Sequence, residues 1–175
     1  MKVAIITGAS QGIGAGLVAG FRRSGYAVVG TSRSIPSSDA PDYLSVQGDI
    51  ADAETAERVV ERALDRFGRI DSLINNAGIF IGKPFTDYTA DDYVAVTAVN
   101  LAGFFHITQR AIRQMVRQGG GHVVNVSTSL VDHANSDRPS ALSVLTKGGH
   151  SRIRCRVMRW GPDDSERDRV DAHAA

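Results

Sequence analysis

The sequence predicts an α/β fold, an open, doubly wound parallel sheet of about five strands with helices on both faces. Short apolar runs alternate with helical stretches along the chain, at lengths that suit right-handed βαβ crossovers. The first run leads through three glycines, Gly8, Gly12 and Gly14, into a helix. Ligands bind such sheets at the carboxyl ends of the strands, so functional residues are expected there.

The expected strands are short and apolar, and they lie at residues 3–6, 27–30, 43–47, 72–75 and 122–126. The expected helices carry apolar residues at helical spacing, and they cover 13–21, 53–67, a long region of about 90–118, and a last helix that Ser140 caps. The long region is expected to be two helices that meet near Asn100. Within 53–67, Glu54 and Arg58 are spaced for an i,i+4 pair.

The bulk composition bounds the class of protein. A chain of 175 residues with 42% hydrophobic and 22% charged residues indicates one globular domain. The net charge of +1 gives no global field for nucleic acid or an anionic membrane. No apolar run approaches the roughly 20 residues that span a bilayer, and no signal peptide is visible, so a cytoplasmic protein is expected. A single cysteine, Cys155, excludes a disulfide framework and a cysteine-rich metal site.

The stretch from Val3 to Gly14 has the layout of a dinucleotide phosphate site: strand, glycine turn, helix. The glycines let the backbone approach a pyrophosphate, and the helix N-terminus favours negative charge. The glycines alone fit a ligand-free βα turn equally well. Other polar stretches follow the later strands, at residues 31–34, 49, 75–78 and 127–129. Their convergence at one edge of the sheet favours a ligand site.

These residues together resemble the short-chain dehydrogenase/reductase family over about residues 2–149. The resemblance rests on Thr7-Gly8-Ala9-Ser10-Gln11-Gly12-Ile13-Gly14, Asp49, Asn75-Asn76-Ala77-Gly78, Asn100 and Lys147, in family order. It implies a Rossmann-like domain, a nicotinamide cofactor, and reversible hydride transfer between an alcohol and a carbonyl compound. The implied partner is therefore a small-molecule alcohol or carbonyl substrate.

The resemblance also implies cofactor-binding roles for particular residues. Those of the pyrophosphate turn are Gly8, Ser10, Gly12, Ile13 and Gly14, and those that line the adenosine ribose are Asn76, Ala77 and Gly78. Asp49 is implied to hydrogen-bond the adenine ring, with a surface turn residue as the alternative. Asn100 is implied to hold a water near Lys147, or is simply a polar helix break. Lys147 is implied to bind the nicotinamide ribose and to lower the pKa of a tyrosine through its charge.

Charge at the end of the second strand predicts the choice of cofactor. An NAD site places a carboxylate about 20 residues after the glycines. Here the strand ends in Thr31-Ser32-Arg33, with no acid. A guanidinium suits a 2′-phosphate through paired, charge-assisted hydrogen bonds. We therefore predict NADP(H) rather than NAD, with contacts from Arg33, Ser32 and Ser34. The alternative for Arg33 is a solvated loop residue.

The catalytic helix departs from the family pattern Tyr-x-x-x-Lys, because the residue four before Lys147 is Ser143. A serine hydroxyl is shorter and far less acidic than a phenol. Thr128 best matches the substrate-orienting serine, with Ser127 and Ser129 as alternates, and Asp132 or His133 is an alternative proton donor. The predicted catalytic set is Asn100, Thr128, Ser143 and Lys147. Two hypotheses follow: an NADP(H)-dependent oxidoreductase, or an inactive relative that keeps nucleotide binding.

The composition changes abruptly after Gly149. Residues 150–175 hold six arginines, several acids, and the only cysteine and tryptophan. We therefore divide the chain into an NADP-binding domain at 1–149 and an atypical tail at 150–175, as in a C-terminally truncated or frame-altered family member. The fifth strand is then expected to be an open edge, with reduced stability and a tendency to associate. Family members usually pair through the long helices, so a homo-oligomer is expected. Acids balance the tail arginines, so no nucleic-acid partner is expected.

Overall fold

The computed structural model describes the whole chain except residues 39, 134–138, 152–154 and 159–175. One sheet has the strand order β3-β2-β1-β4-β5-β6. The strands are β1 (Val3–Thr7), β2 (Ala27–Ser32), β3 (Tyr43–Gln47), β4 (Ser72–Asn75), β5 (Gly120–Asn125) and β6 (Cys155–Met158). The pairs among β1 to β5 are parallel, which confirms the predicted fold class.

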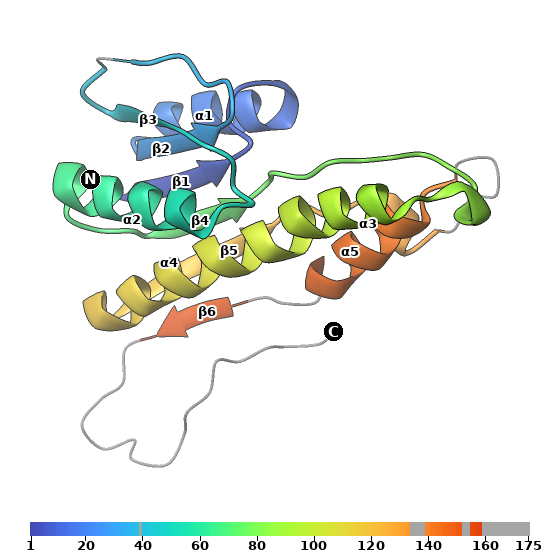
Figure 1. Cartoon of the computed structure of the whole chain (residues 1–175). Helices are drawn as coiled ribbons and strands as arrows, with labels where there is room; N and C mark the ends of the chain where they lie inside the picture. The colour runs from blue at the N-terminus through green and yellow to red at the C-terminus, as the bar shows by residue number, and fades with distance from the viewer. Residues whose placement is uncertain (39, 134–138, 152–154, 159–175) are drawn as a thin grey trace, which may run out of the picture.

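The helices are α1 (Gly12–Arg23), α2 (Ala53–Phe67), α3 (Ala90–Thr97), α4 (Phe104–Gln118) and α5 (Ala141–Ser151). Helix α1 lies on one face of the sheet, and α2 and α4 lie on the other (Figure 1). Val3 and Ile5 pack in the core beneath α2 and α4, whereas Ala4 and Ile6 pack with Val18 of α1. Alternate side chains of a strand point to opposite faces, so a strand covered on both sides must be apolar throughout. None of the described helices has the length and apolarity needed to cross a bilayer.

Helices α3 and α4 meet near Asn100, as expected, through a π-helical turn at Ala98–Gly103. Helices α3 and α4 lie nearly in line, and α5 packs against α3 (Figure 1). Three strands are longer than expected, and β1 gains Thr7 at its end. Strand β2 extends to Ser32, so Arg33 follows it directly, and β5 begins at Gly120. Gly119 alone ends α4, in the left-handed region with φ 88°.

The expectation that β5 is an open edge is wrong. Strand β6 pairs antiparallel with β5, from Gly120 opposite Met158 to Val123 opposite Cys155. The segment expected to be an atypical tail thus supplies a strand that pairs with β5 from Gly120 to Val123. Helix α5 runs to Ser151, across the proposed boundary. The division of the chain after residue 149 stays a prediction.

Candidate functional site

The carboxyl ends of β1 to β4 surround a cleft of about 370 Å³. Every residue predicted for the pyrophosphate turn, adenine ring, adenosine ribose and 2′-phosphate lines it: Gly8, Ser10, Gly12, Ile13, Gly14, Ser32, Arg33, Ser34, Asp49, Asn76, Ala77 and Gly78. Sequence reasoning assigned no role to other lining residues, among them Thr31, Gly48, Ile50, Ile79 and Val99. Most of these directly adjoin a predicted residue, and that adjacency was the available signal.

The glycine turn has the backbone geometry that its sequence predicts. Gly8 and Gly12 have φ values of 66° and 54°, in the left-handed region that favours glycine. A Cβ on Gly14 would collide with the carbonyl oxygen of Gly8 and lie 2.8 Å from the Asn76 Nδ2. Helix α1 therefore starts directly against the end of β1. Gln11 at the N-cap makes no side-chain bond to the helix, so a ligand can satisfy the N–H groups of the first turn.

Hydrogen bonds between Asn76 and Thr7 hold the end of β4 against this turn. The Asn76 side-chain amide donates to the carbonyl oxygens of Thr7 at 2.9 Å and Gly8 at 3.2 Å. In return, the Thr7 hydroxyl accepts from the backbone N–H groups of Asn76 at 3.1 Å and Ala77 at 2.9 Å. The segment predicted to line the ribose is thus held against the phosphate turn. Sequence reasoning missed this role of Thr7, although the residue stands directly before Gly8.

At the end of β2 the cleft is lined by hydroxyls and a cation. The Thr31 Oγ1 and Ser32 Oγ are buried and have no hydrogen-bond partner among the described residues. Arg33 is exposed beside them, and Asp49 is the one carboxylate among the described lining residues. The Asp49 carboxylate also accepts from the Ala51 N–H at 3.0 Å, so Asp49 holds the turn after β3 as well as lining the cleft. Unpartnered hydroxyls, an uncapped helix start and glycines at positive φ fit a phosphate-bearing nucleotide.

Lys147 of α5 lies behind the wall of the cleft. Its Nζ donates to the carbonyl oxygens of Ala77 at 3.2 Å and Val126 at 3.3 Å. Burial lowers the pKa of this ammonium below its ordinary value. A Cβ on Gly78 would lie 2.7 Å from the Nζ, so the missing side chain of Gly78 leaves room for the ammonium. Lys147, predicted to bind the nicotinamide ribose, thus contacts the segment that was predicted to line the adenosine ribose.

Asn100 joins that segment to α5. Its Oδ1 accepts from the Ile79 N–H at 2.9 Å, and its Nδ2 donates to the Ile79 carbonyl at 3.1 Å and the Thr146 hydroxyl at 3.0 Å. Asn100 is 1% exposed, and Thr146 directly precedes Lys147. The side chain therefore fixes both the loop after β4 and the helix that carries the lysine. The water that the resemblance implies at Asn100 stays a prediction.

Ser143 and Thr128 differ in what they contact. Ser143 is 5% exposed on α5, one turn before Lys147, and its Oγ has no partner among the described residues. The Thr128 hydroxyl accepts from the Leu130 N–H at 3.3 Å and caps the short 3₁₀ turn Ser129–Val131. Asp132 and His133, the alternative proton donors, are exposed on the loop after β5. The catalytic roles of Thr128 and Ser143 stay predictions.

The comparisons with known proteins agree with this geometry. A family model described as short chain dehydrogenase matches residues 2–136. The chain belongs to this family. A putative ketoacyl reductase of the granaticin polyketide synthase from Streptomyces violaceoruber is 34% identical over 160 residues, which are 85% of this chain and 62% of that protein. An L-rhamnose 1-dehydrogenase (NAD(P)(+)) from a Sphingomonas species is 36% identical over 141 residues, 73% of this chain and 54% of that protein.

Solved structures of the family are similar to this chain over most of its length. A short-chain dehydrogenase/reductase from Serratia marcescens matches with a TM-score of 0.76 and 31% identity, over 85% of this chain and 66% of that chain. A short chain dehydrogenase from Bacillus anthracis matches with a TM-score of 0.77 and 29% identity, over 85% and 63%. This chain thus spans less than two thirds of the length of the two relatives named above.

Proposed function

We propose that this chain binds NADP(H) in the cleft and acts as a short-chain oxidoreductase on an alcohol or carbonyl compound. The observation that carries the proposal is that the residues predicted for the pyrophosphate, the adenine, the adenosine ribose and the 2′-phosphate all line one cleft. A bound nicotinamide nucleotide supplies or accepts a hydride. The residues of the chain bind and orient that nucleotide.

Different residues of the chain bind different groups of the nucleotide. The first turn of α1 receives the pyrophosphate, since its N–H groups and dipole favour negative charge. Arg33 pairs with the 2′-phosphate, and Ser32 and Ser34 add hydroxyl donors beside it. Lys147 binds the nicotinamide ribose hydroxyls, and its position is fixed by the Ala77 and Val126 carbonyls.

The preference for NADP(H) is tested at Arg33. We expect Arg33→Ala to weaken NADPH binding by roughly 10- to 100-fold, because a charge-assisted pair with the 2′-phosphate is lost, and to leave NADH binding unchanged. Fluorescence titration with both nucleotides measures the two dissociation constants. Arg23→Ala, an exposed arginine in the last turn of α1, is the matched control and should change neither. Equal NADPH binding by Arg33→Ala and the parent would contradict the assignment.

A second candidate function is binding of NADP(H) without turnover. Ser143 favours it, because a buried serine hydroxyl replaces the family's phenol one turn before Lys147. Both candidates require the same nucleotide to bind, so only a measurement of turnover separates them.

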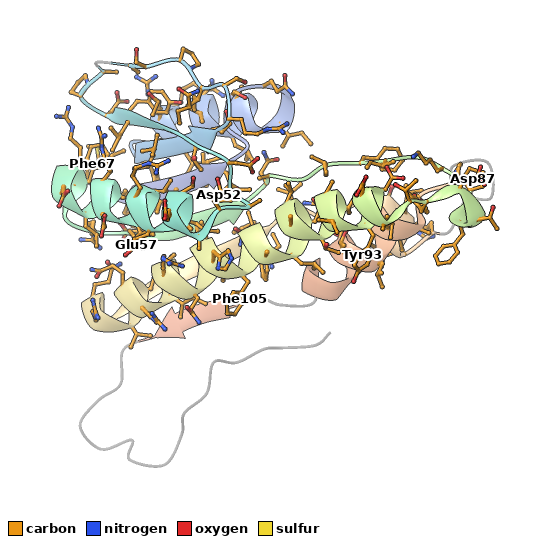
Figure 2. The ribbon with its side chains drawn as sticks, in the orientation of Figure 1. Asp52, Glu57, Phe67, Asp87, Tyr93 and Phe105 are labelled. Carbon is orange, nitrogen blue, oxygen red and sulfur yellow. The ribbon has the colours of Figure 1, made fainter. Side chains whose placement is uncertain are left out.

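We also propose that the long helices pair with a second copy of this chain. Exposed apolar side chains recur along them, with Tyr93 at 52%, Leu101 at 39% and Phe105 at 55% exposure; Figure 2 shows Tyr93 on α3 and Phe105 on α4. Covering such a stripe removes apolar surface from water. We expect a dimer by sedimentation velocity, and Phe105→Glu should give a monomer. Phe85→Glu, on a separate turn, should leave the dimer intact, and a monomeric parent protein would refute the pairing.

A further inference from the structure

Strands β2 and β3 remain linked beyond their last register pair, Ser32 opposite Gln47. The Gly48 N–H donates to the Ser32 carbonyl at 3.1 Å. The Gln47 side chain then reaches further, and its Nε2 donates to the Arg33 carbonyl oxygen at 2.8 Å. The peptide that carries Arg33 is therefore held from the neighbouring strand by a side chain.

Gln47 is itself fixed by α2. The Arg58 Nη2 donates to the Gln47 carbonyl at 3.0 Å and lies 3.4 Å from the Thr55 hydroxyl. Arg58, which the sequence spacing assigns to Glu54, thus holds the backbone of β3. The approach is close, because a Cβ on Gly48 would lie 2.6 Å from the Thr55 Oγ1 and 2.7 Å from the Arg58 Nη2. The backbone of Gln47 is therefore held in place by its contact with α2.

The position of Gln47 separates it from the ligand. Arg33, Ser34, Gly48 and Asp49 line the cleft, whereas Gln47 is not among the lining residues. Its side chain does contact a lining residue, because the Nε2 donates to the Arg33 carbonyl, and this bond is a route by which Gln47 acts on a bound nucleotide. Arg33 is exposed, and its planar guanidinium is rigid whereas its aliphatic side chain is flexible. It loses rotamer freedom when it pairs with a phosphate, and a fixed backbone at its base reduces that loss.

We propose that Gln47 is a positioning residue that aims Arg33 at the 2′-phosphate and so contributes to a preference for NADP(H) over NAD(H). This inference rests on the proposed function and adds a residue that determines its specificity. Gln47 contributes through one donor, the Nε2 amide, so a side chain of similar length without that donor should lose the effect.

The test is a double-mutant cycle between Gln47→Met and Arg33→Ala, with NADPH and NADH dissociation constants measured by fluorescence titration. We expect Gln47→Met to weaken NADPH binding by roughly 3- to 10-fold, the size of one net hydrogen bond, and to leave NADH binding unchanged. In the Arg33→Ala background the same change should have no further effect. Gln109→Met, the same substitution on α4, is the control and should change neither constant.

The outcomes separate the inference from the function on which it rests. If the parent chain binds no NADPH, the proposed function fails. If the parent prefers NADPH but Gln47→Met keeps that preference, weakens both nucleotides equally, or acts equally in the Arg33→Ala background, the positioning role is refuted. Thermal melting shows whether each variant folds, and Gln47→Leu replaces the methionine variant if that one does not.

Discussion

Replacing Ser143 with tyrosine is expected to raise the rate of NADPH oxidation with a reactive carbonyl compound by about 100-fold or more. A positioned general acid contributes roughly 10²- to 10⁴-fold to such a step. A phenol has a pKa of about 10, far closer to neutrality than a serine hydroxyl, and the Lys147 ammonium one turn away lowers it further. Loss of NADPH absorbance across a panel of aldehydes and ketones measures the rate.

The control for this gain is Ser143→Phe, which adds the same ring without the hydroxyl. Ser143 is 5% exposed, so both variants are melted to show that the ring is accommodated. If only the tyrosine variant oxidises NADPH faster than the parent, the phenol hydroxyl supplies the general acid that the parent lacks. No gain in a folded variant that binds NADPH would favour the second candidate, nucleotide binding without turnover.

Replacing Gly14 with alanine is expected to destabilise the domain by about 3 kcal/mol and to abolish NADPH binding. The added methyl would collide with the Gly8 carbonyl oxygen and would lie 2.8 Å from the Asn76 Nδ2. Backbone and a hydrogen-bonded amide cannot move aside as a flexible side chain can, so the contact between α1 and β1 must open. Urea unfolding measures the stability, and NADPH titration measures the binding.

Gly16→Ala is the matched control on the same helix. A Cβ on Gly16 would meet nothing within 4 Å, and alanine favours the helix by up to about 1 kcal/mol over glycine. We therefore expect this variant to be slightly more stable than the parent and to bind NADPH equally. If both substitutions destabilise equally, the close packing at Gly14 is not the cause.

Self-association and nucleotide preference, tested through Phe105, Arg33 and Gln47, are independent of these two results. Phe105 lies on the exposed face of α4 (Figure 2), whereas Arg33 lies in the cleft at the end of β2. A variant that loses the dimer but keeps its nucleotide affinities would show that the cleft is complete within one chain.

Local sequence was sufficient to predict most helices and strands and most residues that line the cleft. The apolar run at 3–6 and the glycines after it predict a buried strand, a turn and a helix, because burial and positive φ restrict which residues can stand there. The carboxyl ends of parallel strands lie at the same edge of the sheet, which is why the sequence alone predicts Arg33, Asp49 and Asn76 in one cleft. The two helices meeting near Asn100 were likewise visible as a polar break.

Only the tertiary structure decided which distant groups complete these elements. Strand β6 pairs with β5 although it lies in the segment expected to be an atypical tail, because backbone groups form a ladder without a particular side chain. The Thr7 hydroxyl, the Gln47 amide and the burial of Ser143 depend on partners 14 to 70 residues away or on packing. The sequence by itself determined a dinucleotide turn and the absence of a tyrosine before Lys147. The contacts that aim Arg33 and enclose Ser143 are long-range, and no local pattern encodes them.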